Sequence, residues 1–227
     1  MRPEQVLVAD AVALLLLLTL AAVTMTGKAR LCHSYVVYLV AALATNRLVT
    51  WWPERFFTQG FWRWKELAFA VLVVAVAAEL VVVGLAGFAR ARQRAVASLA
   101  ALGLGLVYVV GTAVVEASDY RDWMGGVVAT ARTGTAWSLV ILLTVVSWYR
   151  LPMRPWHRMI AIGFILHGGV YSILLGAVGR FGWAAYPYLE ALDPTAYAAT
   201  VGLWAYAAWQ VEWGDLPLEA QERLAGR

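Results

Sequence analysis

The chain has 227 residues, of which 62% are hydrophobic and only 14% are charged. A soluble domain of this length cannot bury so much apolar surface, so we expect lipid to be the main solvent of the protein. The formal net charge is +4, but the basic residues are distributed between the connecting segments. This distribution argues against nucleic acid as a partner.

Seven apolar stretches follow one another, and each meets or approaches the roughly 20 residues that a helix needs to cross a bilayer core about 30 Å thick. They lie near residues 6–27, 31–50, 65–89, 95–117, 126–149, 158–179 and 189–211. We therefore predict an all-α fold, a seven-transmembrane-helix bundle that forms one domain over residues 1–211. Residues 212–227 form a short tail. The first stretch has no clear cleavage site and is expected to be a retained helix.

Two clusters of basic residues fall on the same side of this predicted bundle. They are Arg90, Arg92 and Arg94, and Arg150, Arg154 and Arg158. Cytoplasmic segments of membrane proteins are enriched in Lys and Arg, so we place both clusters in the cytoplasm. The N-terminus is then outside and the C-terminal tail is cytoplasmic.

A Trp-rich segment, residues 51–64, joins the second and third stretches. Aromatic rings with polar edges prefer the headgroup layer, so the segment is expected to be a turn or short helix along the membrane. The sharper alternative is a lid over an outward-facing cavity.

Ionisable residues inside the predicted spans carry the most information, because burying charge in hydrocarbon is costly. Glu79 and His167 are expected at depths of about 16 Å and 13 Å from the cytoplasmic side. They could meet if the third and sixth helices are neighbours. Such a pair could be a structural hydrogen bond, a proton-responsive element or part of a ligand site.

A second group of charged residues gathers toward the outer ends of six spans and suggests a polar vestibule. Its members are Asp10, Arg47, Glu66, Glu116, Arg132 and Asp193. Arg132 lies deep enough to need an acidic partner, for which Glu116 and Asp10 are the candidates. Arg47 and Glu66 are expected to extend toward the headgroups instead.

Two patterns have a packing interpretation. Gly168, Ser172 and Gly176 form a small-residue stripe at which another helix can approach closely. Tyr197 and Trp204 are seven residues apart and share a face of the last helix. That face is suited equally to packing and to lining a cavity for a flat apolar ligand.

Common catalytic motifs are missing from the sequence, and no enzyme activity or cofactor is predicted. The three histidines, His33, His157 and His167, are too few and too scattered for a convincing metal centre. Cys32 is the single cysteine, which excludes an internal disulfide. The last span has no lysine, so a retinal Schiff base cannot form there.

The run Phe61-Trp-Arg-Trp-Lys-Glu66, followed by Glu79 in the same helix, resembles a group of uncharacterised bacterial seven-helix integral membrane proteins. The resemblance covers about one span. It implies a bacterial cytoplasmic (inner) membrane and, for some relatives, a sensory role. It implies no catalytic residue, and only Glu66 and Glu79 are carried over as positions of interest.

These features lead us to expect a membrane receptor or sensor module. It would bind a small or amphiphilic ligand in an outward-facing cavity and signal through a cytoplasmic or membrane protein partner. The alternative is a non-enzymatic accessory subunit of a larger membrane complex. A small-molecule or proton-coupled transporter that uses Glu79 and His167 is the third hypothesis.

Overall fold

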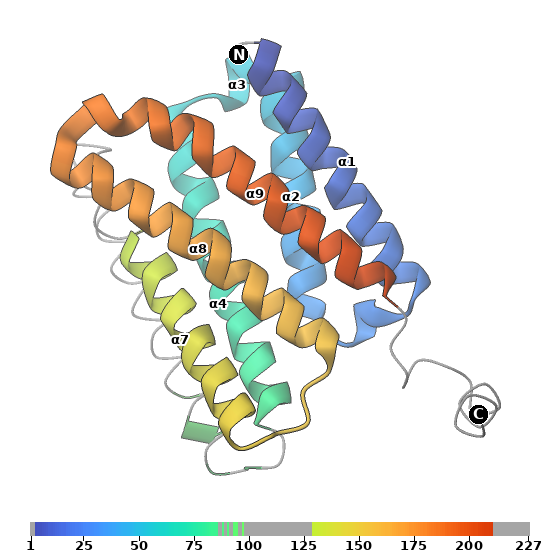
Figure 1. Ribbon diagram of the computed structural model, residues 1–227. Helices are drawn as coiled ribbons and strands as arrows, with labels where there is room; N and C mark the ends of the chain where they lie inside the picture. Colours follow the sequence, from blue (N-terminus) through green and yellow to red (C-terminus); the bar gives the residue numbers. More distant parts are fainter. Residues whose placement is uncertain are drawn as a thin grey trace.

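A computed structural model describes residues 3–85 and 129–210, together with residues 88, 90, 93, 94 and 97. All regular structure within these residues is helical, with no strand. The long helices are α1 (Pro3–Met25), α2 (His33–Trp51), α4 (Gln59–Gly84), α7 (Ala129–Trp148), α8 (Pro155–Phe181) and α9 (Tyr186–Trp209) (Figure 1). The short ones are η1 (Lys28–Arg30), α3 (Pro53–Phe56) and η3 (Gly182–Ala185).

Three of the long helices are long and apolar enough to cross a membrane, over Glu4–Met25, Gln59–Gly84 and Pro155–Val178. The chain is therefore a helical protein with the composition of a membrane protein. Helices α2, α7 and α9 occupy predicted stretches too, but their polar and aromatic side chains dilute the hydropathy. The predicted stretch 95–117 and the tail 212–227 lie outside the described residues.

The six long helices form a closed ring, in which each packs against the next along the chain and α9 returns to α1 (Figure 1). Helices α4 and α7 run in the same direction. Glu66 in the early part of α4 contacts Arg132 in the early part of α7, and Gly84 at the end of α4 faces Leu142 and Val146 of α7.

An aromatic cluster fills the interior of the ring. The Tyr35 ring lies 5.3 Å from that of Trp204 and 5.5 Å from that of Trp156, both nearly perpendicular. Phe164 and Tyr38 complete the contacts around Trp204. Edge-to-face pairs of this kind each contribute about 0.5–1.5 kcal/mol beyond their buried area. Trp204 is fully buried and packs in the core, which favours the packing interpretation of this face over a ligand face.

The outer surface of the ring carries large apolar side chains that water would not tolerate in such number. Leu7, Leu14, Ile141 and Ile173 are each more than half exposed. Lipid is the solvent that suits this surface, since apolar groups there cost nothing to expose.

A buried lysine joins the α1–α2 connection to the end of α9. The Lys28 ammonium donates hydrogen bonds to the carbonyl oxygens of Ala207, Ala208 and Gln210. It also lies 5.6 Å from the centre of the Trp156 ring. The last carbonyl groups of a helix lack partners within the helix, and a cation there is favourable. Lys28, in the connection between α1 and α2, thus caps the C-terminal end of α9.

The predicted small-residue stripe is only partly a packing surface. A Cβ atom on Gly168 would lie 3.3 Å from that of Ala136, and the Ser172 hydroxyl lies 2.8 Å from that of Thr133. Both residues therefore face α7. Gly176 has no atom near its Cβ direction within the described part of the chain. The packing role of Gly176 therefore stays a prediction.

The Trp-rich segment forms the short helix α3 and the start of α4. Thr58 caps α4 by accepting a hydrogen bond from the amide of Phe61. Trp51, Trp52, Phe57 and Trp64 are all more than half exposed. They cover no cavity among the described residues, which favours the interfacial interpretation over the lid.

The contact between α8 and α9 at Gly163 provides a direct test of the ring packing. A methyl group at this position would lie 2.1 Å from Nε1 of the buried Trp204 ring. We expect Gly163→Ala to lower the free energy of unfolding by about 1–3 kcal/mol, measured as a loss of thermal stability in detergent. Gly169→Ala is the matched control, since its Cβ would meet nothing within 4 Å. Equal melting temperatures for the two variants would contradict the packing.

Candidate functional site: a buried ionic cluster

An ion pair joins the early parts of α4 and α7. The Arg132 guanidinium donates to the Glu66 carboxylate at 2.5 Å, and it stacks over the Tyr171 ring of α8 at 3.8 Å. The Lys65 ammonium lies 3.9 Å from the same carboxylate. Glu66 is only 5% exposed, so its predicted extension toward the headgroups is wrong. Neighbouring helices cover it before it can reach the surface.

The acid bound to Arg132 is therefore Glu66, which was not among the predicted partners. Asp10 is engaged elsewhere, because it accepts a hydrogen bond from Arg47 at 2.7 Å between α1 and α2. That pair is more open, with the Asp10 side chain 56% exposed. Glu116 lies outside the described residues.

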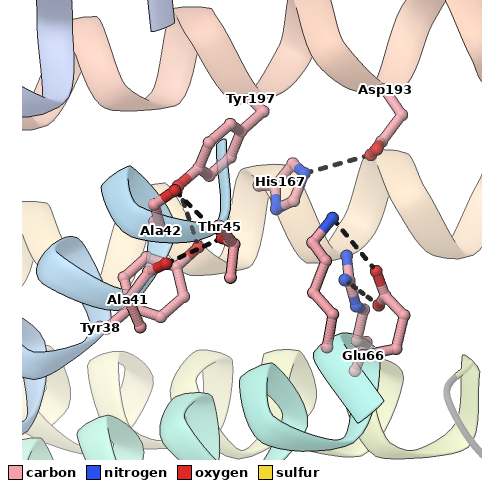
Figure 2. Close-up of polar contacts among 10 residues, drawn as sticks. Tyr38, Ala41, Ala42, Thr45, Glu66, His167, Asp193 and Tyr197 are labelled. Carbon is pink, nitrogen blue, oxygen red and sulfur yellow. Dashed lines mark hydrogen bonds and ion pairs between the residues drawn. The ribbon is translucent and has the colours of Figure 1, made fainter. Parts of the chain in front are cut away.

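A second polar pair joins α8 to α9. Nε2 of His167 lies 3.1 Å from Oδ1 of Asp193. His167 stands near the middle of α8, and its side chain is 12% exposed. Figure 2 shows His167 and Asp193 facing each other across the two helices, with Glu66 approaching from α4 below them.

The predicted meeting of Glu79 with His167 does not occur. Glu79 instead accepts hydrogen bonds from the backbone amides of His33 and Ser34 at 2.9 Å and 2.8 Å. A carboxylate at this place caps the N-terminus of α2. Helix α4 ends at Gly84, so Glu79 lies only about 8 Å from the helix end, at half the predicted depth.

Cys32 borders this cap and is 1% exposed. Its thiol lies 3.4 Å from the Glu79 carboxylate. A structural cysteine that is buried in apolar surroundings is a poor nucleophile, so Cys32 is expected to be inert toward thiol reagents.

A small cavity of about 40 Å³ lies inside the ring, next to both polar pairs. It is lined by Tyr38, Phe69, Val73, Arg132, Thr135, Ala136, Phe164, His167 and Gly168. A cavity needs roughly 10–15 Å³ to hold one water molecule, so this space suits a few waters or one very small ligand. It is too small for an amphiphilic ligand, and the predicted cavity for such a ligand stays a prediction.

Two tyrosines stand beside the cavity and connect α2 with α9. The hydroxyl groups of Tyr38 and Tyr197 are 3.5 Å apart, and Figure 2 shows the two side chains directed toward each other. Tyr197 also lies against His167, with 5.1 Å between ring centres. We give the name ionic cluster to five side chains: Arg132, Glu66, Lys65, His167 and Asp193. They come from four helices, and the Tyr38 hydroxyl of a fifth helix lies near them.

Sequence reasoning missed Lys65, Tyr38 and Tyr171 as neighbours of this cluster. Lys65 stands at the start of a predicted span, where a basic residue is common, and the tyrosines look like ordinary core residues. The described part of the chain holds no group of three or more His, Cys, Asp or Glu side chains placed to bind a metal. The chemistry that the cluster offers is proton binding and hydrogen bonding.

Comparisons with protein-family models, with curated proteins and with solved structures find no match to this chain.

Removal of the Arg132 charge should strand a buried carboxylate. We expect Arg132→Met to destabilise the protein by about 3–5 kcal/mol, measured by thermal unfolding in detergent, because Glu66 loses its counter-ion. The double variant Arg132→Met with Glu66→Leu should recover most of that loss. Arg47→Met is the matched control and should cost about 1 kcal/mol or less, because its partner Asp10 is open to solvent or headgroups. A small effect of Arg132→Met would contradict the buried pair.

Proposed function

We propose that this protein is a membrane sensor module in which the ionic cluster is the sensing element. The observation that carries the proposal is the convergence of two polar pairs, from four helices, on one small cavity. The Glu66 side chain is buried, and the other three are largely buried. Burial of ion pairs seldom adds stability over apolar packing. Ionisable groups within a membrane bundle are therefore functional candidates by default.

The arrangement of the pairs supports a switching role. Glu66–Arg132 holds α4 to α7, and His167–Asp193 holds α8 to α9. A change of charge at either pair alters which helices are held together, and packed helices respond by small discrete shifts of about 1–2 Å. An accessory subunit has no need of a charged centre, and a 40 Å³ cavity is too small for most transported solutes. These points favour a sensor over both alternatives.

We further propose seven membrane spans, with the N-terminus outside and the C-terminus in the cytoplasm of a bacterium. Support comes from the parallel neighbours α4 and α7. The end of α4 and the start of α7 lie at opposite ends of the ring, so the chain between them has to return along its whole length. The apolar stretch 95–117 has the length for that return. A partner protein would receive the signal at the cytoplasmic side.

The sensor proposal predicts a helix movement that depends on the His167–Asp193 pair. Spin labels on Tyr149→Cys and Gln210→Cys would report the distance between the ends of α7 and α9, with Cys32 left in place because it is buried. We expect the distance to change by about 1–2 Å or more between pH 8 and pH 5.5, since imidazole changes its charge in this interval. The distance in Asp193→Asn should not respond to pH.

The variant His33→Gln serves as the control, because His33 is an exposed histidine at the start of α2. It should keep the response of the parent protein. A distance that stays constant with pH in the parent protein would contradict the sensor proposal. Reaction of the same two cysteines with a membrane-impermeant label from the cytoplasmic side alone would support the proposed topology, and labelling from outside would contradict it.

A further inference from the structure

We infer that the cavity beside Arg132 and His167 binds one small inorganic anion together with a proton on His167. This inference deepens the proposed function, and its biological meaning rests on that function. It names the chemical class of the stimulus, which is an anion of the size of chloride taken up with a hydrogen ion.

The hydrogen bond of His167 fixes which ring nitrogen is available. A carboxylate only accepts hydrogen bonds, so Nε2 carries the hydrogen in the contact with Asp193. In the neutral imidazole Nδ1 is then an acceptor. Figure 2 shows this second nitrogen pointing away from Asp193, and the structure gives it no hydrogen-bond partner among the described residues. Since His167 lines the cavity, Nδ1 is the atom at which a proton or a cavity ligand can bind.

The charges around the cavity are balanced only while His167 is neutral. Lys65 and Arg132 supply two cations, and Glu66 and Asp193 supply two carboxylates. Within the described residues, the remaining titratable groups that face the cluster are the hydroxyls of Tyr38 from α2, Tyr171 from α8 and Tyr197 from α9, and all three are neutral near pH 7. A proton on Nδ1 therefore leaves one uncompensated positive charge in a region of low dielectric, which favours uptake of one anion.

The walls of the cavity fit such an anion in size and chemistry. Arg132, Tyr38 and His167 are among its polar lining residues, while Phe69 and Phe164 are apolar. Groups that carry hydrogen predominate once Nδ1 is protonated. The volume of about 40 Å³ admits a monatomic halide, which displaces about as much space as a water molecule. Larger organic anions are excluded by size.

Proton and anion binding are reciprocal in this arrangement. Each makes the binding of the other more favourable by the same factor, and couplings between sites typically amount to about 5–150-fold. The neutral imidazole presents a lone pair to the cavity and disfavours an anion. Once protonated, the same nitrogen becomes a donor.

Chloride is the probe that tests this inference, with gluconate at equal ionic strength as the anion that is too large to enter. The thermal stability of the detergent-solubilised protein would be titrated with each salt at pH 5.5 and pH 8. We expect chloride to stabilise the protein with at least about fivefold higher affinity at pH 5.5. Gluconate should have no such effect. An equal effect of both salts, or a chloride effect independent of pH, would overturn the inference.

Two variants and one control assign the site. His167→Gln should lose the pH dependence, and Ala136→Val should lose chloride binding by filling the cavity without changing any charge. The second variant remains informative if the first does not fold. His33→Gln should behave as the parent protein. Retention of the full chloride effect in Ala136→Val would place the anion elsewhere and overturn the inference.

The result is separable from the test of the sensor proposal. A helix movement without any chloride effect would leave the sensor proposal standing and overturn the anion site. Chloride binding without a helix movement would support the anion site and contradict the sensor.

Discussion

The cost of burying charge among packed helices is the constraint on which this structure depends. Arg132 can remain inside the ring only because Glu66 neutralises it and Tyr171 covers its guanidinium face. The same pair links α4 to α7, its parallel neighbour in the ring. Loss of either charge would leave the other unpaired in a region with little water to solvate it. The cluster is therefore an architectural element as well as a candidate site.

The two ends of the ring are built differently. At the end where α2 begins, the contacts are helix caps: Glu79 caps α2, and Lys28 caps α9. Toward the other end, the ionic cluster contains an imidazole next to an internal cavity. A proton or anion that acts on the cluster would thus change contacts at one end of the ring. A tilt of whole helices would carry that change to the opposite ends of α7 and α9.

The apolar stretches of the sequence predicted the six long helices, because long apolar runs are typical of helices in membrane proteins. Three of these helices are long and apolar enough to cross a membrane. The residues near the cluster were also predictable as a class, since charge inside a span is rare. The partners of these charged residues were not predictable from the sequence. Arg132 pairs with Glu66 because α4 and α7 are neighbours, and that order depends on the packing of the entire ring. Glu79 was predicted too deep because α4 ends at Gly84, well before the basic cluster that begins at Arg90.

The switching role depends on the His167 imidazole, which holds its hydrogen on Nε2 toward Asp193 and leaves Nδ1 to the cavity. Nitrogen-15 NMR of the protein in lipid would observe both ring nitrogens directly, with His167→Gln used to separate its signals from those of His33 and His157. We expect Nε2 to be protonated and Nδ1 to be unprotonated at pH 8. Acidification in the presence of chloride should add a proton to Nδ1. A hydrogen on Nδ1 at pH 8, or a ring that does not titrate, would contradict this switching role.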